Sequence, residues 1–204
     1  MSSPLKAKSA LAGVAVPGRY GRTHGEAGVV ITERIGLGLA TVAARKRKTD
    51  VVKQAVAAAY GVDLLGSSRI AQGSAVSFIG YGPGQWLAVS ESLANEELAR
   101  ELSAKLAGLA SISDQSGGRT VLRLSGPHVR DVLGKGLPID LDPRVFPLGS
   151  AITSVISHMG VQLWQLDDTR SYDIAIFRSL SESFWSWLTA SAAAYGYEVV
   201  PDRA

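Results

Sequence analysis

Hydrophobic residues follow two patterns along this chain. Some form short clusters rich in β-branched residues, and others form stripes that recur every three or four positions. Clusters of the first kind predict β-strands, and stripes of the second kind predict helices. The predicted strands cover residues 29–32, 37–42, 75–79, 86–90, 110–114, 120–124, 151–156, 161–166 and 172–177, with a last edge strand at 199–200. The predicted helices cover residues 50–60, 95–107, 127–133 and 180–195.

Polar and glycine residues at the expected positions support these helix boundaries. Thr49 and Asn95 are typical N-caps, and Gly61 and Gly108 end the helices that follow them. Pro127 suits the first turn of the third helix. Ser179 and Glu182 have the spacing of a capping box before the fourth helix.

The elements follow the order ββαββα and then ββαβββα, so the chain is predicted to repeat one topology twice. Hairpin spacing favours antiparallel sheets with helices packed against them, an α+β fold. We expect a single domain over residues 27–204, formed by two similar halves at about 27–109 and 110–200. Residues 1–26 are predicted to be a basic arm, mobile in isolation.

Charge is distributed unevenly over the 204 residues, which contain 21 Lys or Arg and 18 Asp or Glu. Residues 1–60 hold ten of the basic and three of the acidic residues, which leaves eleven and fifteen in the remainder. A basic end on a mildly acidic body indicates electrostatic docking. The run Arg45, Lys46, Arg47 and Lys48 is therefore a candidate subunit interface. Nucleic-acid binding by this run is an alternative, but interleaved aromatic residues are missing, and we expect no nucleic-acid partner.

Several kinds of chemistry are disfavoured by composition. The chain has no cysteine, which excludes disulfides and thiolate metal sites and fits a reducing cytosol. His24, His128 and His158 are far apart in sequence and are interpreted as surface or capping residues, so no metal site is predicted. No apolar run has the length of a membrane helix, and the short stretch at 10–16 is a poor signal peptide. We expect a cytoplasmic protein without a membrane association.

No constellation of residues predicts a catalytic or cofactor site. Gly80, Gly82 and Gly84 are followed by a strand, which predicts a hairpin turn rather than a phosphate loop. The adjacent Asp167 and Asp168, with Asp173 nearby, are interpreted as turn residues, as is Asp114. We therefore expect no catalytic, cofactor-binding or metal-binding residue in this chain.

Aromatic residues concentrate in the helix predicted at 180–195. Phe184, Leu188 and Tyr195 fall on one face, whereas Trp187 is displaced from it. Two interpretations stay open: the helix is buried on two sides, or Trp187 faces a partner. Trp185 and Trp187 are therefore candidate interface residues, in addition to the basic run.

Three segments carry a resemblance to a known family: 113–127 (SDQSGGRTVLRLSGP), 131–149 (DVLGKGLPIDLDPRVFPLG), and 178–179 with 183–188 (RS and SFWSWL). In order and spacing they are similar to the gamma subunit of heterotetrameric sarcosine oxidase. The segment Asp114–Leu188 carries most of the likeness, and the N-terminal half matches more loosely through residues 82–87 (GPGQWL).

The resemblance implies a fold like the first domain of the glycine-cleavage T-protein, an aminomethyltransferase. It implies a complex with alpha, beta and delta subunits that oxidises sarcosine to glycine with oxygen, releases hydrogen peroxide and passes the one-carbon unit to tetrahydrofolate. FAD, FMN, NAD and zinc would then be held by the other subunits, with no cofactor in this chain. No catalytic residue is carried over, because no motif here matches one.

The T-protein-like fold leaves one alternative function open, a free-standing folate-binding or aminomethyltransferase-like protein. The length of 204 residues argues against it, because it leaves no room for further T-protein domains. The resemblance therefore favours a non-catalytic subunit that contributes to the assembly and stability of an oxidase.

Overall fold

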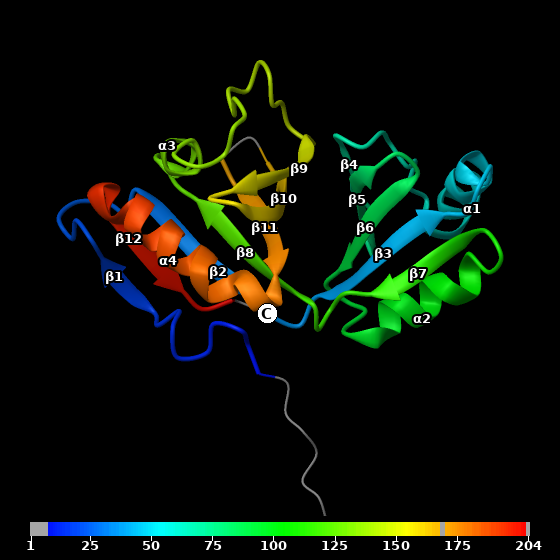
Figure 1. Ribbon diagram of the computed structural model, residues 1–204, viewed down its shortest axis with the longest axis horizontal. Coiled ribbons are helices and arrows are strands. Elements are labelled where there is room, and N and C mark those ends of the chain that lie inside the picture. The colour runs from blue at the N-terminus through cyan, green and yellow to red at the C-terminus, as the bar shows by residue number, and fades with distance from the viewer. Residues whose placement is uncertain (1–7, 168–169, 203–204) are drawn as a thin grey trace, which may run out of the picture.

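A computed structural model describes residues 8–167 and 170–202 of the chain. Two β-sheets meet along a central seam, and helices cover the outer face of each sheet (Figure 1). The molecule therefore has four layers in the order helix, sheet, sheet, helix. This arrangement agrees with the α+β class predicted from the sequence.

The larger sheet has the strand order β1-β12-β2-β8-β11-β10-β9. Its strands are β1 (Gly18–Tyr20), β2 (Val29–Arg34), β8 (Arg119–Ser125), β9 (Ala151–Ile156), β10 (Met159–Gln165), β11 (Tyr172–Phe177) and β12 (Tyr197–Val200). Its helices are α3 (Val129–Leu133) and α4 (Ser181–Ala192), the latter flanked by 3-10 turns at Arg178–Leu180 and Ala193–Tyr195.

The smaller sheet has the strand order β4-β5-β6-β3-β7. Its strands are β3 (Gly38–Ala44), β4 (Ile70–Ala71), β5 (Ser77–Gly82), β6 (Gln85–Ser90) and β7 (Ala110–Asp114). Its helices are α1 (Thr49–Tyr60) and α2 (Glu96–Lys105).

The predicted duplication is present, and it includes an exchange of strands between the two sheets. The smaller sheet, β4-β5-β6-β3-β7, has the same order as β9-β10-β11-β8-β2 in the larger one. The first strand of each repeat pairs with a strand of the other repeat. Thus β2 of the first repeat pairs antiparallel with β8 of the second, and β7 of the second pairs antiparallel with β3 of the first. The sheets consequently do not follow the boundary that the sequence suggested near residue 110, because each repeat completes the sheet of the other.

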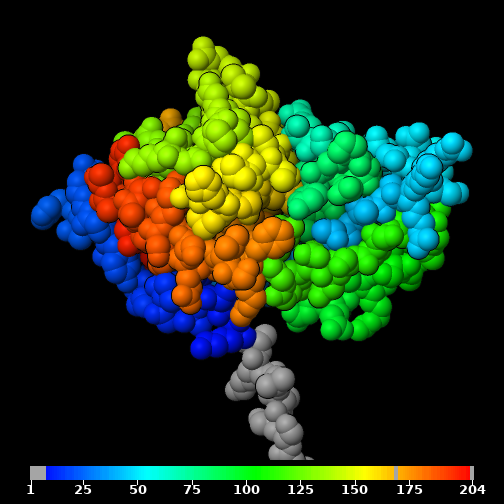
Figure 2. Space-filling view, in the orientation of Figure 1, coloured from blue at the N-terminus to red at the C-terminus, as the bar shows by residue number. Residues whose placement is uncertain are grey.

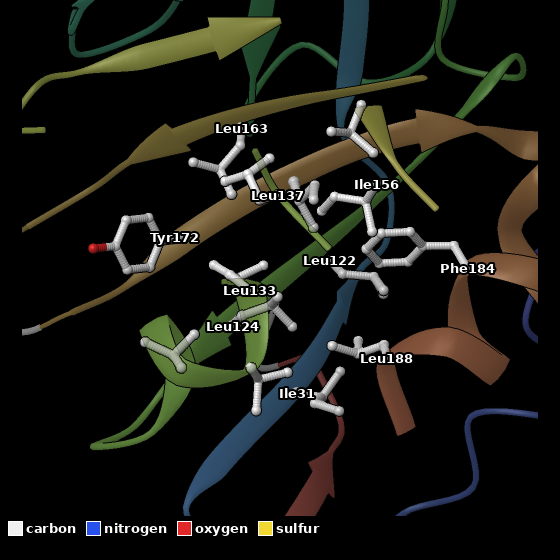
Figure 3. Packing of buried hydrophobic residues seen from close by; sticks show 14 of the residues in the cluster. Ile31, Leu122, Leu124, Leu133, Leu137, Ile156, Leu163, Tyr172, Phe184 and Leu188 are labelled. Atoms are coloured by element: carbon white, nitrogen blue, oxygen red, sulfur yellow. The ribbon is translucent and has the colours of Figure 1, made fainter. Parts of the chain in front are cut away.

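Alternation along the strands places apolar side chains on both faces of each sheet. The outer face of the larger sheet packs on α3 and α4, and Figure 3 shows Phe184 and Leu188 of α4 pointing toward Leu122 and Ile31. The outer face of the smaller sheet packs on α1 and α2. Between the sheets, a smaller apolar cluster that includes Ile79, Leu87 and Trp164 fills the seam. Burial on both faces explains why the sequence shows continuous apolar runs.

Helix ends differ from the predicted caps in detail. Gly61 ends α1 in the left-handed conformation, with φ 65°, as expected. Asn95 is the N-cap of α2 as predicted, although its side chain makes no cap hydrogen bond. The N-cap of α1 is Lys48 rather than Thr49, and that of α4 is Leu180 rather than Ser179. These ends are stabilised by backbone turns and packing, which no capping motif encodes.

The two ends of the chain are more involved in the fold than predicted. Residues 18–20 form β1, which pairs with β12, and the side chain of Leu11 is buried in the core under α4. The described part of the predicted mobile arm, residues 8–26, is therefore attached to the domain. The strand at 199–200 begins at Tyr197 and lies inside the sheet, parallel to β2, and not at its edge. The short β1 and β4 lacked enough β-branched residues to be predicted.

Candidate functional site

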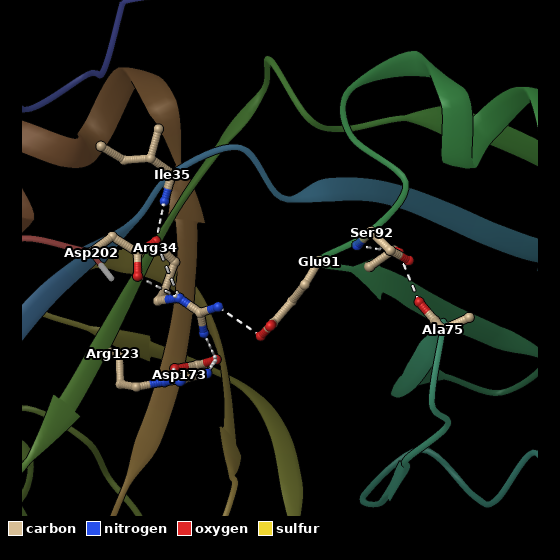
Figure 4. Close-up of polar contacts among 9 residues, drawn as sticks. Arg34, Ile35, Ala75, Glu91, Ser92, Arg123, Asp173 and Asp202 are labelled. Atoms are coloured by element: carbon tan, nitrogen blue, oxygen red, sulfur yellow. Dashed lines mark hydrogen bonds and ion pairs between the residues drawn. The ribbon is translucent and has the colours of Figure 1, made fainter. Parts of the chain in front are cut away.

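A network of ion pairs lies where the two sheets meet, centred on Arg34 at the end of β2 (Figure 4). Arg34 Nη2 lies 2.6 Å from Glu91 Oε1, and its Nη1 lies 3.7 Å from Asp173 Oδ2. Its Nε lies 3.3 Å from Asp202 Oδ1. One guanidinium thus joins the larger sheet, the loop after β6 of the smaller sheet, and the C-terminal tail.

Arg123 and Asp173 form the second part of this network. They face each other across β8 and β11 in register, and Arg123 donates from Nε and Nη2 to the two carboxylate oxygens at 2.8 and 3.0 Å. Opposite charges directly across a strand pair stabilise the pairing. Both side chains point to the inner face because Val121, two residues before Arg123, also lies in the seam between the sheets.

The network lines a pocket of about 290 Å³ between the sheets. Its lining also includes Gln72, Ser74 and Ser77 of the smaller sheet's side and Trp164 of β10. Burial raises the pKa of Asp173, and the hydrogen bond and charge of Arg123, with the charge of Arg34, oppose that rise. Burial of Arg123 lowers the pKa of its guanidinium, but the hydrogen bond and charge of Asp173 outweigh this effect and raise that pKa.

The charged residues that line this pocket pair with one another. Each of its charged residues, namely Arg34, Glu91, Arg123 and Asp173, already has an opposite charge as partner. Its lining includes neither histidine nor cysteine among the described residues. The pocket is also at the small end of the range for ligand sites, about 300–1,000 Å³. The ion pairs thus connect the two sheets, and the charged groups in this lining do not form an evident acid–base pair.

This network was not predicted from the sequence. Only Asp173 was noted, for its proximity to Asp167 and Asp168. A charged residue within an apolar strand, such as Arg123 in 119–125 or Asp173 in 172–177, is the signal that could have identified it. Arg34 and Asp202 lie far apart in sequence, so their pairing required the folded structure.

The basic run from Arg45 to Lys48 forms the turn between β3 and α1. All four side chains are exposed, and Arg47 adopts a positive φ of 61°. Among the described residues none of the four forms a salt bridge. This turn is the part of the predicted interface that lies fully on the surface, and its role stays a prediction.

The two candidate tryptophans lie in different environments on α4. Trp185 is only 8% exposed and belongs to the main core, so packing within this chain accounts for its burial, and an interface role for it stays a prediction. Trp187 is half-buried, and its ring centroid lies 5.5 Å from that of Phe184. A Cβ atom at Gly136 would lie 2.6 Å from Trp187 Cζ2, so the ring covers that glycine closely. Of the two open interpretations, burial on two sides therefore explains Trp185, whereas an interface role for Trp187 stays a prediction.

The remaining candidates are turn residues, as the sequence suggested. Gly80 to Gly84 form the β5–β6 hairpin. Asp114 Oδ1 accepts hydrogen bonds from the backbone N–H and the hydroxyl of Ser116, and Asp167 Oδ1 accepts one from the N–H of Ser171. Asp168 lies outside the described residues.

The three histidines have different surroundings in the folded chain. His24 and His158 are exposed, and His128 Nδ1 lies 2.7 Å from Asp131 Oδ2 beside the ring of Tyr195. The described residues include no group of three or more His, Cys, Asp or Glu arranged to hold a metal ion. None of the described helices is long and apolar enough to cross a membrane.

Comparison with known structures first defines the class of fold. The chain is similar to the glycine cleavage system aminomethyltransferase T from Bartonella henselae, with a TM-score of 0.64 over 86% of this chain and 48% of that one. At 14% identity this likeness concerns the fold alone. The duplicated two-sheet arrangement is thus an aminomethyltransferase-like fold, as the resemblance implied.

Residues 45–194 match the sequence profile of the Sarcosine oxidase, gamma subunit family, and the chain belongs to this family. It is similar to a chain of the heterotetrameric sarcosine oxidase from Corynebacterium sp. U-96, with a TM-score of 0.77 and 28% identity. That match covers 93% of this chain and 96% of the other.

Two curated relatives, both sarcosine oxidase gamma subunits, agree with this assignment. The one from Corynebacterium sp. (strain P-1) is 36% identical over 130 residues, and the one from Arthrobacter sp. is 37% identical over 123 residues. The alignments cover 63% and 58% of this chain, and they span only 62% and 59% of the relatives' own lengths.

Proposed function

We propose that this chain is the non-catalytic gamma subunit of a heterotetrameric sarcosine oxidase. In this role it contributes to the assembly and stability of a complex that converts sarcosine, oxygen and tetrahydrofolate to glycine, 5,10-methylenetetrahydrofolate and hydrogen peroxide. The observation that supports it best is the match to a chain of such an oxidase over nearly the full length of both chains.

The site geometry supports a role without chemistry in this chain. The pocket between the sheets is lined by charged residues that form ion pairs with one another. FAD, FMN, NAD, tetrahydrofolate and zinc are accordingly assigned to the other subunits of the complex. The absence of cysteine accords with assembly in the cytoplasm.

The partners in this proposal are the alpha, beta and delta subunits. The exposed basic turn from Arg45 to Lys48 is suited to an acidic surface on one of them, since its four cations have no carboxylate partner among the described residues. Steering by such a run depends on salt, so association should slow as ionic strength rises.

Co-expression of this chain with the alpha, beta and delta subunits tests the proposal. We expect a complex that contains all four chains in equal amounts and oxidises sarcosine. The matched experiment omits this chain alone and should yield less complex and less activity. Recovery of a fully active, stable oxidase without it would refute the proposal.

A free-standing folate-binding or aminomethyltransferase-like function is the alternative, and the pocket between the sheets is the observation that favours it. Against it stand the small volume of that pocket and the mutual pairing of its charges. Calorimetry with tetrahydrofolate on the isolated chain distinguishes the two. Micromolar binding would support the alternative, and no heat of binding would remove it.

A further inference from the structure

The smaller sheet has an open edge at β7, whereas the equivalent strand of the larger sheet is covered. In the larger sheet, β12 pairs with β2, and β1 pairs with β12 in turn. Among the described residues, β7 pairs with β3 alone, so one side of its backbone has no strand partner. Figure 2 shows this part of the molecule as the green surface at the lower right, next to the cyan surface of α1. An open edge of this kind is a template for pairing with another strand.

The free backbone groups of β7 belong to alternate residues. Hydrogen bonds toward the chain of β3 flank the strand, one accepted by the carbonyl of Leu109 at 2.9 Å and one donated by the N–H of Gln115 at 2.8 Å. Antiparallel pairing alternates, so the odd-numbered residues between them also bond to β3. Ile112 and Asp114 consequently direct their N–H and C=O groups away from the sheet.

The larger sheet shows that a further strand fits beside this position. There β12 pairs with β2 along its four residues, and its Val199 is buried in the core beneath α4. The helix α2 covers the outer face at β7 as α4 covers it at β2. The sequence of β7, ASISD, contains neither lysine nor proline, and its register with β3 is continuous. It therefore lacks the devices that protect natural edge strands from pairing.

The basic turn, Arg45 to Lys48, lies at the N-terminal end of this edge. The N–H of Arg45 donates to the carbonyl of Leu109 at 2.9 Å, immediately before β7. Lys105, in the last turn of α2, adds a fifth exposed cation near it. Asp50 and Glu101 are the nearest acidic residues along these two segments, so this end of the edge has a positive net charge.

The C-terminal end of the edge is acidic. Asp114 ends β7, and Glu96 and Glu97 lie in the first turn of α2. The hydroxyl of Ser116 bonds Asp114 Oδ1 at 2.7 Å and the carbonyl just before Glu96 at 3.1 Å, which brings the start of α2 to this end of β7. Arg100 lies 3.8 Å from Glu96, and the other two carboxylates leave an excess of negative charge.

We propose that β7 pairs antiparallel with β7 of a second copy of this chain, about a two-fold axis centred on Ile112. The two-fold axis reverses the strand, so the basic end of each copy lies opposite the acidic end of the other. Ser111 then faces Ser113 of the second copy, and Asp114 faces Ala110, so no like charges lie directly opposite. The edge is thus self-complementary, as an isologous dimer requires.

A strand of another subunit is the other conceivable occupant, and the charges favour the second copy. Symmetry matches both ends of the edge at once, whereas an unrelated strand has to supply an acidic and a basic end in the correct order. The pairing concerns the free chain, and its test needs no other subunit, so it stands or falls apart from the proposed function. Because it covers the basic turn, the dimer and the proposed docking of that turn exclude each other.

The test uses two charge-reversal variants of the full chain, which change opposite ends of the edge. The first carries Arg45→Glu with Lys46→Glu, and the second carries Glu96→Lys with Glu97→Lys. All four side chains are exposed, so both variants should stay folded, which thermal unfolding checks. A matched control reverses one exposed Arg and one exposed Lys beside the larger sheet, with Arg22→Glu and Lys135→Glu.

Sedimentation over a series of chain concentrations is the main measurement. We expect a wild-type dimer with a Kd on the order of 10 µM, as befits a small polar interface, and a larger Kd at high salt. Each edge variant alone should dimerise at least about tenfold more weakly, because like charges then meet at both ends, whereas the control should stay within about twofold of the wild type. An equal mixture of the two edge variants should recover the dimer, because opposite charges meet again.

Amide hydrogen exchange locates the contact on the backbone. The amides of Ile112 and Asp114 should exchange more slowly as the wild-type concentration rises. Those of Ser111 and Ser113, which already bond to β3, should not change. This alternation distinguishes strand pairing from a contact of the charged side chains alone.

Three results would overturn the inference. The first is a wild-type chain that stays monomeric at concentrations well above the expected Kd. The second is a dimer that both edge variants retain, or that forms without protection of Ile112 and Asp114. The third is protection of these two amides only when the other subunits are added, which would assign the edge to a strand of one of them.

Discussion

The two sheets of this protein have the same five-strand plan but different additions. The smaller sheet consists of the shared plan alone, whereas the larger one is extended by β12 and β1 and carries a projecting loop, residues 138–149, before β9. At the equivalent position of the smaller sheet, before β4, the connection stays close to the body of the molecule (Figure 1). The additions to the shared plan therefore all lie on one of the two sheets.

The exchanged strands explain why such additions are tolerated. Because β2 and β7 each complete the sheet of the other repeat, neither repeat can separate from the other without breaking a strand ladder in both sheets. The core of each repeat is thereby shared with its partner. Additions to the larger sheet leave this shared framework intact.

A matched pair of core substitutions tests whether the two repeats share one core, and it should have the largest effect. Leu188 on α4 and Leu102 on α2 are both fully buried, at corresponding helices of the two repeats. Replacement of either by Ala should lower the free energy of unfolding by about 2–5 kcal/mol. In each variant we expect both sheets to unfold in one transition. Amide hydrogen exchange of β5 and β10 at increasing urea concentrations measures this. Loss of one sheet while the other stays protected would show independent units.

The ion network at the seam provides the next contrast. Asp173→Asn removes a buried carboxylate that pairs with the buried Arg34 as well as with Arg123, so the variant should lose about 3 kcal/mol of stability. Glu91→Gln removes a partner that is mostly exposed, and should cost less than about 1 kcal/mol. Chemical denaturation measures both. Equal losses would mean that burial does not decide the strength of these pairs.

Trp187 tests whether α4 supports only its own core. Its ring packs on Phe184 and covers Gly136, so Trp187→Ala should destabilise the isolated chain by about 2 kcal/mol, roughly half the cost for a fully buried ring. Thermal unfolding of the free chain measures this. An unchanged melting temperature together with weaker assembly would instead establish Trp187 as a subunit contact.

The smallest effect concerns the loop of residues 138–149 and depends on pH. Hydrogen bonds from Arg144 hold the pKa of Asp142 at about 2, below its ordinary value of 3.8. Because the folded pKa is the lower one, the ionised carboxylate favours the ordered loop above the ordinary value, and this contribution disappears as the pH falls toward 2. Carboxyl NMR titration should give this value, and Arg144→Gln should raise it toward the ordinary value, while the backbone hydrogen bond from residue 144 preserves part of the shift. A normal pKa in the wild type would contradict the pairing.

Much of the fold could be predicted because it depends on local patterns. The apolar stripe with Leu98 and Leu102 identifies α2 by itself, and the β-rich cluster of 172–177 identifies β11 at its observed bounds. The order of these elements indicated the duplication, and three sequence blocks indicated the family. The candidate interface was harder to predict, because a tryptophan such as Trp185 can lie either in the core or on the surface, and the sequence does not distinguish the two.

The sequence by itself determined which segments become strands and helices, where the charge lies, and that thiol chemistry is excluded. Only the tertiary structure decided that β2 and β7 exchange sheets, that Arg34 meets Asp202 and Asp173, and that Val145 and Leu148 stay exposed while Trp185 is buried. The physical reason is the range of the interactions. Periodicity and capping act over a few residues, whereas strand pairing, ion pairing and burial depend on groups that the chain brings together from distant positions.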